Sequence, residues 1–215
     1  GAKTWNDFDD QDGKRPVSIT INLFANGTKI DSKTVTAKDG WKWSFSDLDK
    51  FDKDHKLINY TISEDVVKDY ESEVKGYDVI NTHKPELTKI EGTKTWKDND
   101  NQDGKRPVAI IINLLKNGTK IDSKTVTAED GWKWSWTNLE KYEKGKLINY
   151  TISEEVVEGY ETEVKGYDVI NTHKPETVSI NGTKTWNDSD NQDGKRPVSI
   201  TITLFADGTK MDSKT

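Results

Sequence analysis

The sequence Gly-Tyr-Asp-Val-Ile-Asn-Thr-His-Lys-Pro-Glu stands at residues 76–86 and returns unchanged at residues 166–176, 90 residues later. A second string, Lys-Thr-Trp, begins at residues 3, 94 and 184 and follows almost the same period. Solenoid repeats run at about 20–50 residues, whereas a period near 90 suits small domains of about 100 residues. The sequence therefore predicts a tandem array, with repeat 1 at residues 1–86, repeat 2 at residues 87–176 and the start of a truncated repeat 3 at residues 177–215.

Alternation of apolar and polar residues predicts β-strands throughout the repeat. Val17, Ile19, Ile21 and Leu23 share one face of a strand, and the pair Asn26-Gly27 that follows favours a hairpin turn. No segment has a helical period. We expect an all-β fold of tandem antiparallel β-sandwich domains of immunoglobulin-like type. Further strands are predicted at residues 41–45 and 58–64 and on both sides of the turn at residues 76–77.

Composition excludes several classes of function. Acidic and basic residues are interspersed and the net charge is −6, so no basic stripe is present to follow a nucleic-acid backbone. No apolar run approaches the ~20 residues that cross a bilayer, which argues against membrane insertion. The chain has no cysteine, which excludes disulfides and thiolate zinc sites. Because small extracellular domains usually need a staple, another kind of cross-link is the natural feature to seek.

Three polar residues fall on faces that the alternation assigns to the core of repeat 1. Lys3 shares its face with Trp5, Glu64 continues the series of Tyr60 and Ile62, and Asn81 follows Val79. Repeat 2 has the same pattern. An unpaired charge among aromatic side chains would cost several kcal/mol, so we expect the three polar groups to meet one another. Their counterparts in repeat 2 are Lys94, Glu154 and Asn171.

This set of residues has the chemistry of a cross-link. Burial lowers the pKa of a lysine and raises that of a glutamate, so such a pair can exist as a neutral amine and a neutral acid. The amine can attack the asparagine carboxamide and expel ammonia, leaving an amide between two side chains. This is a single-turnover self-modification and not an enzyme activity on external substrates. The alternative is an ordinary, hydrogen-bonded polar cluster.

Four motifs follow one another in a fixed order: Lys-Thr-Trp, Gln-Asp-Gly-Lys-Arg-Pro, Tyr-Thr-Ile-Ser-Glu and Val-Ile-Asn-Thr. This order resembles the B-type repeat of Gram-positive collagen adhesins, the CnaB domain. The resemblance implies an inverse immunoglobulin-like sandwich in which a first-strand lysine is joined to a last-strand asparagine by an isopeptide bond that a glutamate promotes. By position, the bonds would join Lys3 to Asn81 with Glu64, and Lys94 to Asn171 with Glu154.

Repeat 3 contains the equivalent lysine, Lys184, but neither partner, so no third bond is expected in this chain. Asp65 and Glu155 are rival acids next to the predicted promoters, and the alternation places them on the outward face. Trp41 and Trp43 could form a platform for sugars, although core packing is the favoured interpretation.

The remaining polar motifs favour surface roles. The acidic loop at residues 99–104 resembles the start of a calcium loop but lacks the glutamate at the twelfth position, which favours a solvated turn. The histidines, at positions 55, 83 and 173, are too scattered for a metal site or a catalytic triad and are expected on the surface. No cofactor and no metal are expected.

The resemblance and the near-identity of the repeats predict a structural role. We expect spacer repeats of an extracellular bacterial adhesin, anchored to the cell wall through a region outside this chain, with the neighbouring repeats as partners. One alternative is that the repeats themselves bind a host or matrix ligand. Another is a pilin-like subunit.

Overall fold

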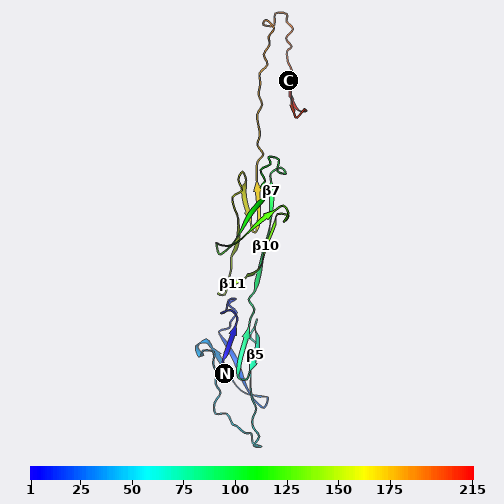
Figure 1. The fold of residues 1–215 in the computed structure, drawn as a ribbon. Coiled ribbons are helices and arrows are strands. Elements are labelled where there is room, and N and C mark those ends of the chain that lie inside the picture. Colours follow the sequence, from blue (N-terminus) through cyan, green and yellow to red (C-terminus); the bar gives the residue numbers. More distant parts are fainter. The chain divides into compact units, whose positions relative to one another are not determined.

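The computed structural model describes residues 1–215 and forms two compact units, Gly1–Pro175 and Glu176–Thr215. The first unit contains repeats 1 and 2, each with a hydrophobic core of its own. Nearly all regular structure is β-strand, and the one exception is a single turn of 3-10 helix at Ala37–Asp39 (Figure 1). No helix has the length and apolar character needed to span a membrane.

Repeat 1 is built from two small sheets. One sheet has the strand order β3-β2-β4 and the other has the order β1-β6-β5. The strands are β1 (Lys3–Asn6), β2 (Ser18–Ala25), β3 (Thr28–Thr36), β4 (Tyr60–Glu64), β5 (Glu71–Lys75) and β6 (Asp78–Thr82).

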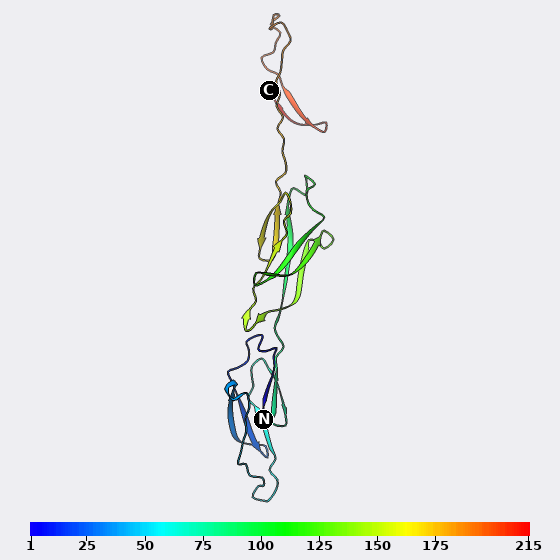
Figure 2. The same ribbon diagram turned by 60° about the vertical axis from the view of Figure 1, so that its left-hand side comes forward.

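Repeat 2 uses the same plan with one more strand in its second sheet. The sheet orders are β13-β8-β9 and β10-β7-β15-β14, and β11 and β12 form a separate two-stranded hairpin. In both Figure 1 and Figure 2, β7 and β10 lie side by side. The strands are β7 (Leu87–Lys97), β8 (Ala109–Lys116), β9 (Thr119–Thr127), β10 (Lys133–Glu140), β11 (Tyr142–Glu143), β12 (Lys146–Leu147), β13 (Tyr150–Glu154), β14 (Glu161–Lys165) and β15 (Asp168–Thr172).

The second unit contains one antiparallel pair, β16 (Ile202–Ala206) and β17 (Thr209–Lys214). This pair is the counterpart of the β2–β3 and β8–β9 hairpins in the complete repeats. The turn residues Asn26 and Gly27 have φ values of 50° and 84°, and Asn117 and Gly118 have 50° and 85°. Two consecutive positive φ values are what a type I′ hairpin turn requires, so the predicted Asn-Gly hairpin is confirmed.

The core of each repeat lies between its two sheets. In repeat 1, Ile21 and Leu23 from β2 pack in the same cluster as Ile62 from β4 and Val79 from β6. The equivalent cluster in repeat 2 is larger, because its buried members also include Ile90, Trp136, Ile148 and Tyr150. The predicted β-sandwich is therefore confirmed.

The face assigned to Val17 and the strand assigned to Trp41 were wrong, although Trp41 packs against the core as expected. Val17 is 89% exposed, because the ladder between β2 and β3 begins only at the pair Ser18–Thr36, so Val17 lies before it. Trp41 has a φ of 55° and belongs to the turn after Gly40, not to a strand. It packs edge-on against Trp5, with ring centroids 5.1 Å apart, and is half-buried.

The first and last strands of each repeat are neighbours. β1 pairs with β6 in parallel, from Lys3 beside Val79 to Asn6 beside Thr82, and β7 pairs with β15 in the same way. All other strand pairs are antiparallel. This parallel pairing brings together two segments that lie nearly 80 residues apart in sequence.

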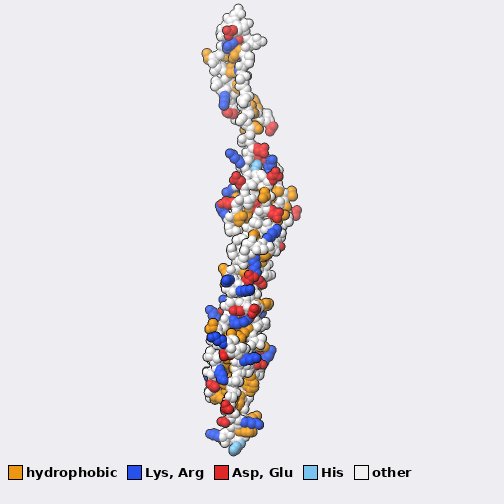
Figure 3. All heavy atoms as spheres, turned by 90° about the vertical axis from the view of Figure 1, so that its left-hand side faces the viewer, with side chains coloured by type: hydrophobic (Ala, Val, Ile, Leu, Met, Phe, Trp, Pro, Cys, Tyr) orange, Lys and Arg blue, Asp and Glu red, His pale blue; other side chains and the backbone are white.

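Charged side chains on one face of the molecule do not segregate by sign (Figure 3). On the face shown in Figure 3, lysine and arginine side chains alternate with aspartate and glutamate. Such a distribution leaves no extended single-sign field on that face.

Candidate cross-linking site

The lysine and asparagine singled out from the sequence occupy adjacent strands in both repeats. In the register of β1 and β6, Lys3 lies beside Val79 and Trp5 lies beside Asn81. Residues two apart on a strand share a face, so Lys3 and Asn81 are diagonal neighbours on the inward face. Lys3 is 7% exposed and Asn81 is 0% exposed. Lys94 and Asn171 have the same exposures and the same register in repeat 2.

The glutamate reaches this pair from the opposite sheet. Glu64 ends β4, and its Oε1 lies 2.5 Å from the Lys3 Nζ. Both side chains are almost completely buried, at 1% and 0% exposure. In repeat 2, Glu154 at the end of β13 makes the same ion pair with Lys94. The alternation rule therefore placed these residues correctly: the lysine, glutamate and asparagine all lie inside the sandwich.

Burial dominates the electrostatics of the two lysines. Desolvation lowers the pKa of Lys3 below its ordinary value, and the hydrogen bond and charge of Glu64 offset only part of that effect. The pKa of Lys94 is lowered for the same reason, against the same kind of partner, Glu154. A lowered pKa increases the fraction of neutral amine, which is the nucleophilic form.

The asparagine side chain has no competing role in the fold. Neither Oδ1 nor Nδ2 of Asn81 has a hydrogen-bond partner, and the same holds for Asn171. A buried carboxamide without hydrogen bonds is unusual and costs free energy, so it requires an explanation. Conversion of the carboxamide to a secondary amide would supply one.

A hydroxyl group completes the site, and sequence reasoning missed it. Ser72 on β5 donates a hydrogen bond of 2.9 Å to Oε2 of Glu64, and Thr162 on β14 donates one of 3.0 Å to Oε2 of Glu154. One oxygen of each carboxyl group thus contacts the lysine, and the other accepts a hydrogen bond from a hydroxyl group. The signal in the sequence was the presence of a hydroxyl residue at the same position in both copies, Glu-Ser-Glu and Glu-Thr-Glu.

Tryptophan rings border the site. The Lys3 Nζ lies 4.8 Å from the centroid of the Trp5 ring, and the Lys94 Nζ lies 4.5 Å from that of Trp96. Such rings exclude water and attract the charged form of lysine through the cation–π interaction.

The rival acids point away from this site. Asp65 is exposed and accepts a hydrogen bond of 2.8 Å from Asn22, while Glu155 is about half exposed and pairs with Lys120 at 3.6 Å. Lys184 in the second unit is exposed and lies outside any strand, 4.6 Å from the Trp186 ring centroid.

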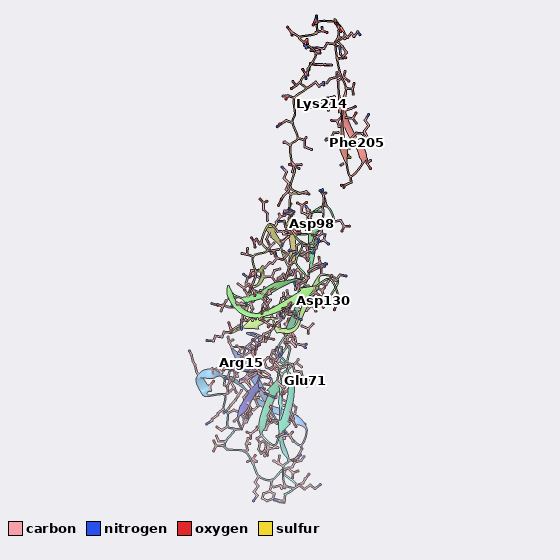
Figure 4. The ribbon with its side chains drawn as sticks, turned by 45° about the horizontal axis from the view of Figure 1, so that its top comes forward. Arg15, Glu71, Asp98, Asp130, Phe205 and Lys214 are labelled. Atoms are coloured by element: carbon pink, nitrogen blue, oxygen red, sulfur yellow. The ribbon has the colours of Figure 1, made fainter.

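A second polar cluster supports the first strand of each repeat. Asp98 is buried and accepts two hydrogen bonds from the Arg106 guanidinium, at 2.7 and 3.0 Å, and one of 2.8 Å from the Tyr160 hydroxyl. Arg106, and then Tyr160, hold the pKa of Asp98 well below its ordinary range. Burial and the bond to Asp98 raise the pKa of Tyr160 to about 12. Figure 4 labels Asp98 and also Arg15, which makes the equivalent pair with Asp7 in repeat 1.

The surface expectation for His83 was wrong. His83 is buried, with its Nε2 2.9 Å from Asp12 and its Nδ1 2.7 Å from the Asp69 carbonyl oxygen. His173 makes the equivalent contacts with Asp103 and Gly159. The acidic loop is exposed at Asn99, Asp100, Gln102 and Gly104, as expected for a solvated turn, while His173 holds its last aspartate, Asp103. His55 is exposed as expected.

The arrangement has the parts of an amide-forming reaction. A buried amine of lowered pKa lies on the strand next to a carboxamide without hydrogen bonds, and a carboxyl group from the opposite sheet contacts the amine. The carboxyl can accept a proton from the amine and return one to the departing nitrogen. In each site, the lysine, the glutamate and the asparagine all belong to the same repeat.

Comparison with known proteins matches the chain to a family of B-type repeat domains. The family model for the Cna protein B-type domain matches residues 1–82, 90–172 and 180–215. The collagen adhesin of Staphylococcus aureus is 44% identical over 218 residues, which cover 98% of this chain and 18% of that protein.

One solved structure supports the same match, and a second is similar in sequence. A crystal structure of two B repeat units of the collagen-binding protein of Staphylococcus aureus is 41% identical and covers 100% of this chain and 59% of that one, with a TM-score of 0.56. A structure of a single B repeat unit of the same protein is 40% identical over 81% of this chain, with a TM-score of 0.41. The chain thus spans about a fifth of the length of the curated relative it matches.

Proposed function

The chain belongs to the Cna protein B-type domain family, and from that premise we propose that its complete repeats are spacer domains of a cell-wall-anchored adhesin, each locked by an intramolecular Lys–Asn isopeptide bond. The bonds join Lys3 to Asn81 and Lys94 to Asn171. The observation that carries the proposal is the buried asparagine without hydrogen bonds, on the strand next to a lysine that is ion-paired with a buried glutamate, in both repeats.

The proposed reaction begins with a proton transfer from the lysine ammonium to the glutamate carboxylate. The neutral Nζ then attacks Cγ of the asparagine, while the protonated carboxyl polarises its carbonyl group. The nitrogen–carbon bond forms, a proton passes through the carboxyl to Nδ2, and the bond between Cγ and Nδ2 breaks. The nitrogen leaves as ammonia and takes up the proton that the carboxyl still holds, so one ammonium ion is released for each amide formed, and atoms and charge balance. The glutamate ends as the carboxylate with which it began, and each site reacts once.

The bond would stabilise the repeat in two ways. It closes a loop of 78 residues between Lys3 and Asn81, which by the chain-entropy argument used for disulfides is worth about 4 to 5 kcal/mol. It also joins the strand by which the chain enters the repeat to the strand by which it leaves. Tension applied through the chain then passes across the amide, and the strands between Lys3 and Asn81 carry none of it. A spacer that projects a binding region from a cell surface needs both properties.

Intact mass of the purified chain tests this proposal. We expect a mass lower than that of the sequence by two ammonia molecules, because the chain has two complete sites. The variant Glu154→Gln should lose only one, since a neutral amide cannot relay the proton. The matched control is Glu155→Gln, which removes the neighbouring exposed acid and should still lose two. A wild-type mass equal to the sequence mass would reject the cross-link and leave an uncross-linked sandwich array.

The binding alternative has its own test. If repeats recognise a host or matrix ligand, the purified chain should bind matrix proteins in a surface plasmon resonance assay at a strength that does not depend on the cross-links. A spacer should show no such binding, whether or not it is cross-linked.

A further inference from the structure

The acidic loop of repeat 1 contacts a hairpin of repeat 2. The Gly145 N–H donates a hydrogen bond of 2.9 Å to the Gln11 carbonyl oxygen, and the Gln11 side-chain amide donates one of 3.4 Å to the Tyr142 carbonyl oxygen. In Figures 1 and 2 the dark-blue loop after β1 lies next to the β11–β12 hairpin. We call residues 8–14 the joint loop and residues 142–147 the joint hairpin.

Glu86, the last residue of the repeated string, contacts both the joint loop of repeat 1 and Lys141 of repeat 2. Its N–H donates a hydrogen bond of 2.6 Å to Oδ2 of Asp12 in the joint loop, and its carbonyl oxygen accepts one of 3.0 Å from the Lys141 N–H of repeat 2. Its carboxylate pairs with Lys141 at 2.8 Å and with Lys14 at 3.4 Å. Asp12 in turn binds His83, which fixes the chain between β6 and Glu86.

The close approach depends on two glycines. A Cβ atom on Gly13 would lie 2.6 Å from Cα of Gly145, and one on Gly145 would lie 3.1 Å from Cα of Gly13. Lys144 and Gly145 have φ values of 49° and 72°, which gives the hairpin a two-residue type I′ turn. This turn presents the Gly145 N–H and no side chain to the joint loop.

The corresponding hairpin of repeat 1 has a different turn. Residues 51–56 contain one residue more than residues 142–146, and the indel that the sequence places in a polar loop falls in this turn. Only one bridge, between Phe51 and Leu57, forms there. His55 takes up the positive φ, at 61°, so an imidazole stands where repeat 2 has glycine.

The joint loop itself is present in all copies. Gln102, Gly104 and Lys105 repeat the pattern of Gln11, Gly13 and Lys14, and so do Gln192, Gly194 and Lys195. The loop is therefore common to the repeats, while the hairpin that receives it differs between them.

We propose that the joint loop and the Lys-Gly hairpin form a docking interface between successive repeats, and that the hairpin decides which repeat can follow another. Its partner is the Gln-Asp-Gly-Lys loop of the preceding repeat of the same chain. A repeat with the Lys144-Gly145 turn accepts that loop, and a repeat with the His55 turn does not. The interface does not depend on the isopeptide bonds, so its failure and theirs are distinguishable.

A distance measurement across the joint tests the proposal. The chain has no cysteine, so Ser32→Cys and Ser123→Cys introduce two unique sites on exposed, equivalent positions of β3 and β9 for spin labels. Double electron–electron resonance should give one narrow distance distribution for the full chain. The decisive variant replaces residues 142–146 with Phe-Asp-Lys-Asp-His-Lys, the sequence that repeat 1 already accommodates. We expect a broad distribution, as for two domains on a free tether.

A single substitution and its matched control cover the possibility that the exchanged hairpin disturbs folding. Gly13→Ala should also broaden the distribution, because its Cβ would meet the Gly145 backbone. Gly104→Ala occupies the equivalent loop of repeat 2 with nearly the same φ, 65° against 67°, and its Cβ would meet no atom within 4 Å. The control should leave the distribution narrow. A broad distribution in the parent chain, or a narrow one in both the exchange and Gly13→Ala variants, would overturn the proposal.

Discussion

At the scale of single residues, the candidate site is organised around one carboxyl group with two different neighbours. Oε1 of Glu154 contacts the lysine and Oε2 accepts the Thr162 hydroxyl. The hydroxyl restricts rotation of the carboxyl group and so holds the other oxygen toward the amine. We regard Thr162 as a positioning residue, because its hydroxyl donates its hydrogen bond to Glu154 and not to the lysine or the asparagine.

The variant Thr162→Val should slow cross-linking in repeat 2 by about tenfold, which corresponds to about 1.4 kcal/mol in the barrier and is the usual worth of one hydrogen bond to an ionisable group. Protein made by cell-free synthesis can be sampled at intervals, digested and analysed for the cross-linked peptides by mass spectrometry. The peptide of repeat 1 is an internal standard in each sample. Thr162→Ser should restore the rate, because Ser72 has this position in repeat 1. Equal rates for valine and threonine would contradict the positioning role.

The alternation of side chains was sufficient to predict which polar residues of the site lie inside the sandwich. Lys3, Glu64 and Asn81 lie inside the sandwich because a period of two leaves no other face for them once Trp5 packs against the core and Ile62 and Val79 are buried. The hydroxyl of Ser72 was not predictable in this way. It lies on a strand whose residues are exposed overall, and only its hydrogen bond to Glu64 gives it a role.

At the scale of elements, the two repeats differ in the ladder beside the first strand, because residues 87–91 of β7 have no counterpart before Gly1 in this chain. β7 has 11 residues and forms an antiparallel ladder with β10, whereas β1 has 4 residues and its partner segment has only the bridge between Ala2 and Lys42. Sequence patterns predicted a strand at residues 41–45 in the same way as in repeat 2. Whether such a segment forms a ladder depends on the length of the neighbouring strand. The periodicity of the segment itself does not indicate that length.

Amide hydrogen exchange should reveal this difference. We expect the amides of residues 133–136 to exchange about tenfold more slowly, or slower still, than those of residues 42–45, because a continuous ladder must open before exchange occurs. Mass spectrometry of peptic peptides from the intact chain measures both segments in one experiment. The β2–β3 and β8–β9 hairpins have the same register and should exchange alike. Equal protection of residues 133–136 and 42–45 would show that the longer strand adds nothing to local stability.

The surface prediction for His83 failed at this scale too. His83 follows β6 directly, and its ring is buried because the acidic loop after β1 folds over the end of the adjacent strand. The parallel pairing of β1 and β6 puts those two segments together. A pattern of apolar residues predicts the strands but not which of them are neighbours, so the pairing of Asp12 with His83 could not be inferred.

At the scale of the whole molecule, cross-linked repeats should differ from ordinary sandwich domains in their response to force. Without the bond, unfolding of one repeat would release the 78 residues between Lys3 and Asn81, about 270 Å of extended chain at about 3.4 Å per residue. With the bond, the amide bears the tension, and the segment between Lys3 and Asn81 cannot be extended. The chain should therefore show no such step when it is stretched.

Single-molecule force spectroscopy can compare the parent chain with the double variant Glu64→Gln and Glu154→Gln. The parent should rupture at its attachment without unfolding steps from the complete repeats. The double variant should show two steps of about 270 Å, less the small length of each folded repeat. The chain carrying Glu155→Gln serves as the control and should behave as the parent does. Unfolding steps of this size in the parent would contradict a load path through the bonds.

The parallel pairing of the first and last strands also orders events in time. In a polypeptide that emerges N-terminus first, Lys3 is available from the beginning, but β1 has no neighbour until β6 has been made and has folded against it. Completion of each repeat is therefore its last folding step, whatever precedes it. The proposed amide would form only after that step and would not break on later unfolding. A repeat that contains the amide is therefore one that has folded at least once. Repeats that emerge one after another would become cross-linked in the order of their synthesis.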